Sequence, residues 1–376
     1  MFSNTPTSDD SPAPGAQLFA GLMTGTSLDG IDAVLARFRN QRVEILATHS
    51  APLPPTLRER LLALTRPGSD EIDRAGPCHR ALGREYTAAV QALLAGADLE
   101  AEAVTAIGCH GQTVRHRPGD DGFSLQLGCA DTLATGTGLP VISDFRNKDM
   151  VLGGQGAPLA PRFHEYLFGA PDARVAVLNL GGIANVSLLD HGTLTGGFDT
   201  GPANTLLDLW HQRHQGRGFD ADGAWAAGGR VLPMLLDALL ADPYFQLAPP
   251  KSTGREYFHL DWLMNTLEGN VAPRDVQATL AELTARSVAD ALTPFAPARL
   301  LVCGGGAHNR DLMARLQRCL GVPVVATTEA GLAPDWVEAA AFAWLAWAWW
   351  HRVPGNAPAV TGARRPAVLG RLTLPD

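Results

Sequence analysis

Several features that mark common functional classes are absent from this chain of 376 residues. The formal net charge is −8, with 38 acidic and 30 basic side chains, so no basic excess favours nucleic acid or an anionic membrane. The longest apolar run, 339–350, is shorter than the about 20 residues that span a bilayer, and it predicts a buried helix. The first basic residue is Arg37, so residues 1–16 lack the charged and apolar regions of a signal peptide, and we expect a disordered tail there.

Cysteine and lysine are also scarce. The five cysteines form no Cys-x-x-Cys pair, and their odd number leaves at least one unpaired, which favours a cytoplasmic protein. A zinc site at Cys109 and His110 is not expected, because adjacent residues are poor joint ligands and nothing nearby completes a set. Lys148 and Lys251 are the only lysines, and neither follows a glycine. This excludes a Walker A loop and with it a P-loop NTPase.

The order of the predicted elements indicates two related α/β halves. A chain of this length with 46% hydrophobic residues can bury two cores, and a cleft between two domains is then the default binding site. Strand-turn-strand patterns occur at 18–38 and again at 175–198. The repeat is one of topology rather than of sequence letters.

The most informative stretch is the polar turn between the first two predicted strands. It comprises Gly25, Thr26, Ser27, Leu28, Asp29, Gly30, Ile31 and Asp32. The glycines permit positive φ and close backbone approach, the hydroxyl residues offer donors, and the two aspartates could hold magnesium through water. The pattern therefore indicates a nucleoside triphosphate. An ordinary hairpin turn rich in Gly, Ser and Asp explains the segment alone equally well.

A second polar turn contains the candidate catalytic residue. Asp199 directly follows an apolar strand pattern and precedes a helix predicted over 203–211. A carboxylate held at a strand end can accept a proton from a nucleophile. Capping of the following helix is the alternative. The flanking glycines, together with the first polar turn, favour the catalytic base.

A third turn joins a strand over 300–303 to a helix over 310–320 through three consecutive glycines, 304–306. Glycine there lets a base or ribose lie against backbone, and the helix N-terminus attracts phosphate. A tight strand-to-helix connection is the alternative. The spacing does not match G-x-G-x-x-G, so a Rossmann dinucleotide site is a poor fit.

Two further segments carry polar groups suited to a substrate. Residues 143–149 alternate in charge, and with the glycine-rich stretch at 153–158 they predict a loop between the halves. Within this loop Arg146 presents a planar fork suited to a carboxylate, although a solvated salt-bridge cluster is the alternative. A buried strand at 104–109 delivers polar residues at its C-terminal edge, namely His110, Gln112 and Thr113.

In chain order these segments resemble the anhydro-N-acetylmuramic acid kinases from about Phe19 to Trp350. The matching segments are GLMTGTSLDGIDAVLARF, GCHGQTVRHRP, ISDFRNKDMVLGGQGAPLAPRFH, NLGGIANVS, GFDTGPANTLLD, PKSTGREYF, LLVCGGGAHN and DWVEAAAFAWLAW. The departures are small: Thr24 stands where the family often has Ser, and Ala203 where it often has Gly. The resemblance implies an α/β fold of the actin, hexokinase and heat-shock ATPase superfamily, with an interdomain cleft. Its ribonuclease-H-like halves would be residues 17–145, completed by 350–376, and residues 146–349.

The resemblance also implies a reaction. ATP would phosphorylate O6 of 1,6-anhydro-N-acetylmuramic acid while water opens the anhydro bridge at C1, giving N-acetylmuramic acid 6-phosphate. As O6 attacks the γ-phosphate it becomes a better leaving group from the anomeric carbon, and a carboxylate that activates water completes the opening. Asp199 is the expected base.

The resemblance assigns further roles to the residues of these turns. ATP and Mg²⁺ are the expected cofactors, and Asp29 is expected to hold the metal through water. Nucleotide contacts are expected at residues 25–32 and at Gly181, Gly182, Gly201, Gly304, Gly305, Gly306 and Ala307. The sugar would meet Arg146 through its lactyl carboxylate, with further contacts from His110, Gln112, Thr113 and Glu338; for Glu338 the alternative is a charge that favours the helix N-terminus.

Two rival functions remain open. A kinase of the same fold that acts on another sugar or on a carboxylic acid would keep the phosphate turn and the triple-glycine turn, without a water-activating carboxylate. An ATP-driven, non-catalytic clamp would ordinarily add a partner-binding domain, for which the chain lacks room. The expected partners are a small sugar and ATP, with no nucleic acid or membrane, and a homodimer is expected.

Overall fold

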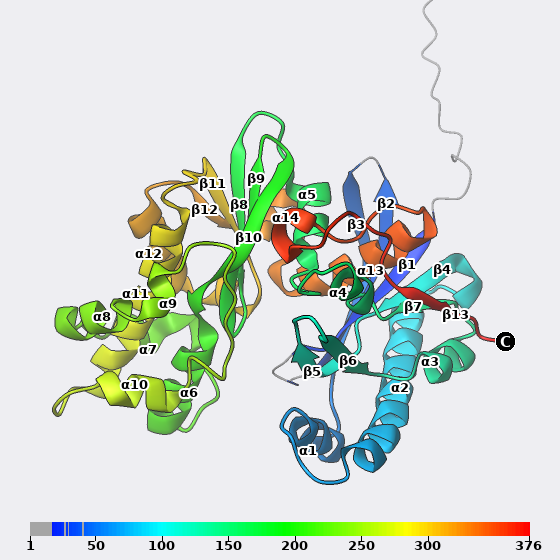
Figure 1. The fold of residues 1–376 in the computed structure, drawn as a ribbon, viewed down its shortest axis with the longest axis horizontal. Helices are drawn as coiled ribbons and strands as arrows, with labels where there is room; N and C mark the ends of the chain where they lie inside the picture. The colour runs from blue at the N-terminus through cyan, green and yellow to red at the C-terminus, as the bar shows by residue number, and fades with distance from the viewer. Residues whose placement is uncertain (1–16, 26–27, 29, 40) are drawn as a thin grey trace, which may run out of the picture.

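Two β-sheets with helices packed on their faces form two lobes that lie side by side (Figure 1). The computed structural model describes residues 17–25, 28, 30–39 and 41–376. The predicted tail, residues 1–16, lies outside this description, as do Thr26, Ser27 and Asp29 of the first polar turn.

The first lobe is built on a sheet of order β13-β7-β4-β1-β2-β3. The meander β1-β2-β3 is antiparallel, whereas β4 is parallel to β1 and β7 is parallel to β4. The last strand of the chain, β13, closes the far edge by pairing with β7. The strands are β1 (Leu18–Met23), β2 (Gly30–Arg39), β3 (Arg42–Pro52), β4 (Val104–Cys109), β7 (Val141–Ser143) and β13 (Arg371–Thr373).

The second lobe repeats this arrangement. Its sheet has the order β10-β9-β8-β11-β12. The meander β8-β9-β10 is antiparallel, whereas β11 is parallel to β8 and β12 is parallel to β11. The strands are β8 (Arg174–Leu180), β9 (Ile183–Asp190), β10 (Thr193–Pro202), β11 (Arg299–Cys303) and β12 (Val324–Ala326). The internal repeat and the two-halved α/β fold predicted from the sequence are therefore confirmed.

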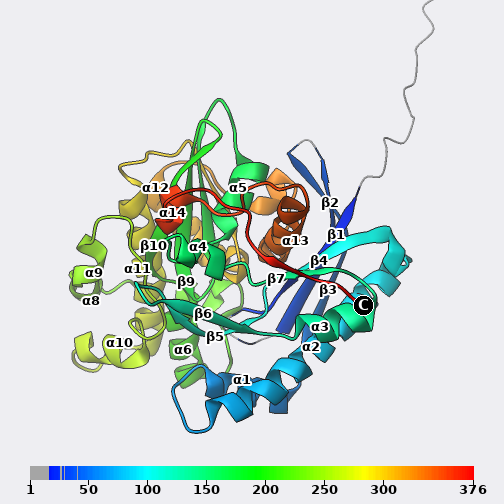
Figure 2. The same ribbon diagram turned by 45° about the vertical axis from the view of Figure 1, so that its right-hand side comes forward.

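Helices cover both sheets, and a separate hairpin of β5 (Gln112–Arg117) and β6 (Phe123–Leu127) flanks the first. The helices that precede the second sheet come first in the chain, and in Figure 2 the first three of them lie below the first sheet. They are α1 (Pro55–Leu64), α2 (Glu71–Gly96), α3 (Ala130–Thr137), α4 (Asn147–Val151) and α5 (Ala160–Phe168). The second lobe and the C-terminal part contain α6 (Asn204–Gln215), α7 (Ala224–Ala227), α8 (Pro233–Leu240), α9 (Pro243–Gln246), α10 (Leu260–Thr266), α11 (Pro273–Leu292), α12 (Arg310–Leu320), α13 (Val337–Trp350) and α14 (Pro358–Thr361).

Helix α13 packs between the lobes, and two glycines determine how closely it approaches the first sheet. A Cβ atom on Gly21 of β1 would lie 2.0 Å from the carbonyl oxygen of Ala339, and one on Gly108 of β4 would lie 2.0 Å from that of Phe342. Its side chains join a core that includes Phe19 of the first sheet and Val177 of the second. The buried helix predicted at the longest apolar run is thus confirmed.

The segment 143–149 was predicted as a loop, and the structure departs from this prediction. Ser143 ends β7 and residues 147–149 begin α4, so the loop prediction is wrong at both places. The reason is Asp149, which is fully buried and accepts hydrogen bonds from Asn356 Nδ2, Thr361 Oγ1 and the Gly156 amide, each at 2.8 Å. A buried carboxylate satisfied in this way ties the C-terminal segment to the chain between the lobes.

The domain limits at 145/146 and at 349/350 remain predictions. Strand β13 does join the first sheet, while α13, which precedes residue 350, packs on β1, β2 and β4. Within the described residues, no helix has the length and apolar character needed to cross a bilayer.

The contact between α13 and the first sheet predicts a stability effect. Gly108→Ala adds a methyl group where backbone occupies the space, and we expect it to lower the free energy of unfolding by at least about 1–3 kcal/mol. Urea unfolding followed by tryptophan fluorescence measures the change. Gly96→Ala at the end of α2 is the matched control, because a Cβ there meets nothing within 4 Å. Equal stability of the two variants would contradict this packing.

Candidate active site

A cleft of about 610 Å³ lies between the lobes. The first lobe contributes the ends of the hairpin turn between β1 and β2, and the second contributes the turn after β8 and the turn after β11. The predicted site residues that line it are Gly25, Gly30, Asp32, Gly181, Gly182, Gly304, Gly305 and Glu338. Turns that are far apart in the sequence therefore face one space.

Two of these turns are in direct backbone contact. Gly304 has φ +78°, and a Cβ on it would lie 2.9 Å from the backbone carbonyl oxygen of Leu180 and 2.4 Å from Asn179 Oδ1. A Cβ on Gly306 would lie 2.5 Å from Leu180 Cβ, whereas one on Gly305 would meet nothing within 4 Å. Gly304 and Gly306 are therefore required for the close packing of the two turns. Gly305 is not, and because it has no side chain, the cleft stays open at this point.

Other predicted nucleotide residues support the turns without lining the cleft. Leu28 and Ile31 are buried, and the Leu28 carbonyl accepts a hydrogen bond from Arg58 Nε at 3.0 Å. Ala307 packs in the core beneath the triple-glycine turn. Gly201 lies against Phe245, because a Cβ there would be 2.8 Å from that ring. Their predicted nucleotide contacts remain predictions.

Asp199 lies inside β10 and not beyond its end, so the prediction of a strand-end residue is wrong. The strand continues to Pro202, which pairs with Ile183 beside the Gly181-Gly182 turn. The helix that follows begins at Asn204 and receives no side-chain cap, so capping by Asp199 is excluded. The apolar pattern ends earlier than the strand because β10 closes on small and polar residues.

The carboxylate of Asp199 is held by the loop after α9. Its Oδ2 accepts hydrogen bonds from the Thr253 amide at 2.9 Å and from the Ser252 hydroxyl at 3.1 Å. Within the described part of the chain no hydrogen bond reaches Oδ1. Burial raises the pKa of Asp199, the two hydrogen bonds partly offset this rise, and the charge of Glu256 adds to it. A partly buried carboxylate with a raised pKa and one unengaged oxygen is suited to accept a proton.

Glu338 brings a second carboxylate to the cleft from the first turn of α13. Its Oε1 accepts a hydrogen bond from Asn179 Nδ2 at 3.4 Å. Burial raises the pKa of Glu338, the charge of Arg146 lowers it, and the carboxylate of Asp32 raises it again. Asp32 and Glu338 are therefore close enough to interact electrostatically across the cleft between the hairpin and α13.

Arg146 and His110 form a pair at the base of the first lobe. Arg146 donates to the Gly156 carbonyl and to His110 Nε2, each at 2.8 Å, and burial lowers its pKa to about 10. Burial and the charge of Arg146 hold the pKa of His110 well below its usual value, so its ring is neutral at pH 7. Because Nε2 accepts from Arg146, the ring proton lies on Nδ1.

Next to this pair, Gln112 and Thr113 begin β5. Gln112 Nε2 donates to the Thr113 carbonyl, and Thr113 Oγ1 accepts from Gln126 Nε2, both at 3.1 Å. The buried Gln112 Oε1 has no hydrogen-bond partner in the described residues. An unsatisfied buried acceptor costs about 1–3 kcal/mol, so it is a candidate for a ligand hydroxyl.

Comparison with known proteins identifies the family. A family model for anhydro-N-acetylmuramic acid kinase matches residues 17–375. The enzyme of that name from Bordetella petrii is 56% identical over 367 residues, which are 96% of each chain. The one from Pseudomonas putida is 50% identical over 360 residues, covering 94% of this chain and 99% of the relative. Among solved structures, the activator of the 2-hydroxyisocaproyl-CoA dehydratase from Clostridium difficile with bound ADPNP is similar to this chain. It is 13% identical with a TM-score of 0.45, over 86% of this chain and 91% of that one.

The chain belongs to the anhydro-N-acetylmuramic acid kinase family. It is accordingly an ATP-dependent sugar kinase, and the resemblance drawn from its sequence is confirmed.

Sequence reasoning missed several residues that line the cleft of this family member. A Cβ on Gly182 would lie 3.1 Å from Arg255 Nε, so the guanidinium of Arg255 rests against that glycine turn. It belongs to the polar loop that contains Lys251. The segment PKSTGREYF resembled the family, yet no local pattern assigned the arginine to the cleft.

The carboxylates of the cleft fit a magnesium ion brought by a nucleotide. Within the described residues no group of three or more His, Cys, Asp or Glu side chains could hold a metal by itself. Magnesium that accompanies nucleotides usually keeps several waters and takes only one or two carboxylates beside phosphate oxygens. Asp32 and Glu338 satisfy that requirement. The predicted ligand Asp29 lies outside the described residues.

The open position at Gly305 predicts a selective loss of nucleotide binding. Gly305→Leu directs a side chain into the cleft without a clash, so the free energy of unfolding should stay unchanged while ATP affinity falls at least about ten-fold, or 1.4 kcal/mol. Calorimetric titration with ATP measures the loss. Gly305→Ala, which adds one methyl group, should bind nearly as the wild type does. Wild-type affinity in Gly305→Leu would show that the nucleotide does not touch this turn.

Proposed function

We propose that the protein phosphorylates O6 of 1,6-anhydro-N-acetylmuramic acid with ATP and opens the anhydro ring with water, giving N-acetylmuramic acid 6-phosphate. The observation that carries this proposal is the position of Asp199. Asp199 lies three positions before Pro202, which is beside the Gly181-Gly182 turn, and three steps correspond to roughly 10 Å of extended strand at about 3.3 Å per residue. A phosphate held at the turn therefore leaves space for a sugar between it and the carboxylate.

The proposed reaction requires two coupled substitutions, one at the γ-phosphorus and one at C1. The C1–O6 bond breaks as a bond forms between O6 and the γ-phosphorus, and the bond from that phosphorus to the ADP oxygen breaks. Water forms the new bond to C1 and gives its proton to Asp199 Oδ1. Positioning and charge neutralisation supply most of the catalysis of phosphoryl transfer, so the role of this carboxylate is confined to the water.

The neighbours of Asp199 support its role as a base. Because the Ser252 hydroxyl and the Thr253 amide both bind Oδ2, they fix the plane of the carboxylate and leave Oδ1 for a water. The pKa of Asp199 is raised toward neutral pH, and a general base is most effective when its pKa lies near the working pH. A kinase that phosphorylated a free hydroxyl would use such a carboxylate to accept the hydroxyl proton, so the product distinguishes the two reactions.

We further propose that the sugar lies over the first lobe beside Arg146 and the buried edge of β5. The Arg146 guanidinium would meet the lactyl carboxylate, and the unpaired Gln112 Oε1 would accept a hydrogen bond from the sugar, with His110, Thr113 and Glu338 nearby. Mg²⁺, when bound with ATP between Asp32 and Glu338, would neutralise phosphate charge. We also infer a cytoplasmic homodimer that binds neither nucleic acid nor membranes.

Removing the base should separate binding from turnover. Asp199→Asn keeps the shape of the side chain and removes its ability to take a proton, so ATP affinity should stay within about three-fold while turnover falls by orders of magnitude. Calorimetry with ATP and a coupled assay of ADP release measure the two quantities. Asp190→Asn at the exposed end of β9 is the matched control and should turn over normally. Full turnover of Asp199→Asn would refute the assignment.

A further inference from the structure

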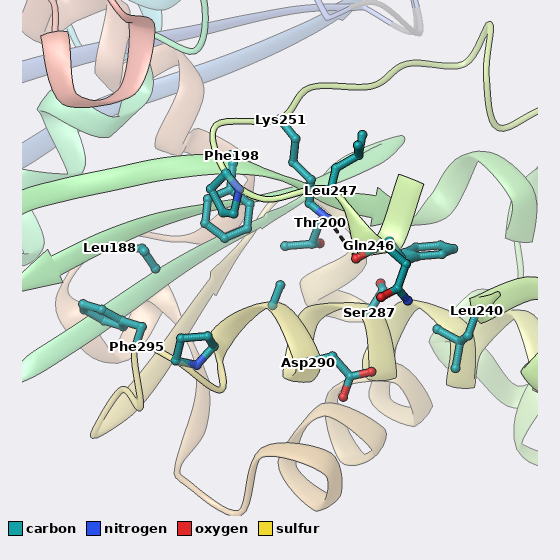
Figure 3. A pocket seen from close by; sticks show the side chains of 14 residues that line it. Leu188, Phe198, Thr200, Leu240, Gln246, Leu247, Lys251, Ser287, Asp290 and Phe295 are labelled. Atoms are coloured by element: carbon teal, nitrogen blue, oxygen red, sulfur yellow. Dashed lines mark hydrogen bonds between the residues drawn. The ribbon is translucent and has the colours of Figure 1, made fainter. Parts of the chain in front are cut away.

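A second cavity, of about 690 Å³, shares no lining residue with the interdomain cleft. It lies in the second lobe between β10, helix α11 and the segment that follows α8 (Figure 3). Phe198 and Thr200 project from the strand, and Ser287 and Asp290 from the helix. Apolar side chains form most of its wall: Leu188, Phe198, Leu240, Phe245, Leu247, Ala291, Pro294 and Phe295.

This cavity lies directly behind the proposed catalytic carboxylate. Successive side chains of a strand point to opposite faces, so Phe198 and Thr200 face the cavity while Asp199 between them faces away. Gly201 follows Thr200 in the strand, and because a Cβ there would lie 2.8 Å from the Phe245 ring, only glycine allows this close approach. One strand thus forms the wall of the cavity and carries the carboxylate.

Lys251 links the cavity to Asp199 a second time. Its side chain lines the cavity, while its carbonyl oxygen accepts a hydrogen bond from the Asp199 amide at 3.1 Å. The next two residues, Ser252 and Thr253, donate the hydrogen bonds that hold Asp199 Oδ2. A displacement of Lys251 would therefore change how the carboxylate is held.

The charge of Lys251 indicates which ligand the cavity accepts. Its ammonium donates to the carbonyls of Tyr244 at 3.2 Å and Phe245 at 3.4 Å, and no carboxylate within the described residues forms an ion pair with it. Two of its three N–H groups are used by these long contacts, and the ammonium also lies 4.7 Å from the centroid of the Tyr244 ring, a weaker partner that an anion would displace. Burial lowers the pKa of Lys251, and an anion in the cavity would oppose that shift.

Apart from Gln246, whose amide can donate and accept, the remaining polar groups favour a ligand with a single anionic group. The hydroxyls of Thr200 and Ser287 already donate to the carbonyls of Ala184 and Thr284, so they offer acceptors and not donors. Asp290, exposed on α11, adds a negative charge that disfavours a second anion. The volume lies within the range of small-molecule sites, about 300–1,000 Å³.

We propose that this cavity is a regulatory site for a small amphipathic monocarboxylate whose anionic group pairs with Lys251 and whose apolar body fills the space between β10 and α11. The ligand draws the ammonium away from the Tyr244 and Phe245 carbonyls and shifts Ser252 and Thr253, so Asp199 loses its fixed orientation and turnover falls. The effect on turnover depends on the proposed role of Asp199, whereas binding to the cavity does not.

The test uses octanoate as the probe, with octanamide as its neutral counterpart. Calorimetry should show that octanoate binds the full-length protein at least ten-fold more tightly than octanamide does. Lys251→Met should remove this preference, because it keeps the apolar stem and loses the charge. Saturating octanoate should also lower kcat of the wild type at least two-fold at saturating ATP and sugar.

A cavity-filling variant supplies the control. Ala291→Trp places an indole in the cavity and should abolish both octanoate binding and its effect on kcat, while Ala95→Trp, exposed on α2 of the other lobe, should retain both. Equal affinity for octanoate and octanamide, or binding that survives Ala291→Trp, would overturn the site. Binding without a change in kcat would overturn its regulatory role. The failure of the proposed reaction would appear separately, as full turnover of Asp199→Asn.

Discussion

The direct backbone contact of α13 with the first sheet is the constraint on which the rest of the site depends. Because Gly21 and Gly108 have no side chains, the helix approaches β1 and β4 until its carbonyl oxygens occupy the space that Cβ atoms would fill. That approach brings Glu338, in the first turn of the helix, beside Asp32 and Asn179. The same helix joins the cores of both lobes, so the geometry of the cleft is set by packing and not by the turns alone.

A division of labour between the two lobes follows from this arrangement. The glycine turns provide backbone surfaces that face one cleft, and Gly304 and Gly306 are required where two turns touch. In the proposed mechanism strand β10 supplies the base, because Asp199 projects from it and the loop after α9 orients its carboxylate. The interior of the second lobe lies directly behind that carboxylate, which allows an event at the far face of β10 to reach the site.

Much of the fold could be predicted from the sequence, because its signals are local. Apolar runs interrupted by Gly-rich turns indicated both meanders, and the uniformly apolar run gave α13. Contacts between distant segments could not be predicted in this way. Asp149 is buried only because Asn356 and Thr361 return to it from the end of the chain, and Arg255 reaches the cleft only through a loop fold with no sequence pattern. The catalytic role of Asp199 was assigned from its chemistry and stays a prediction, whereas its expected place at a strand end was wrong because β10 extends to Pro202.

Isotope labelling tests the central claim most directly, namely that a carboxylate on β10 activates water while O6 receives the phosphoryl group. The protein would be mixed with ATP, magnesium and 1,6-anhydro-N-acetylmuramic acid in oxygen-18 water, and the product quenched early and analysed by mass spectrometry and NMR. The account predicts one labelled oxygen at the anomeric carbon of a ring-opened 6-phosphate. A phosphorylated product that retains the anhydro ring and carries no label would contradict it.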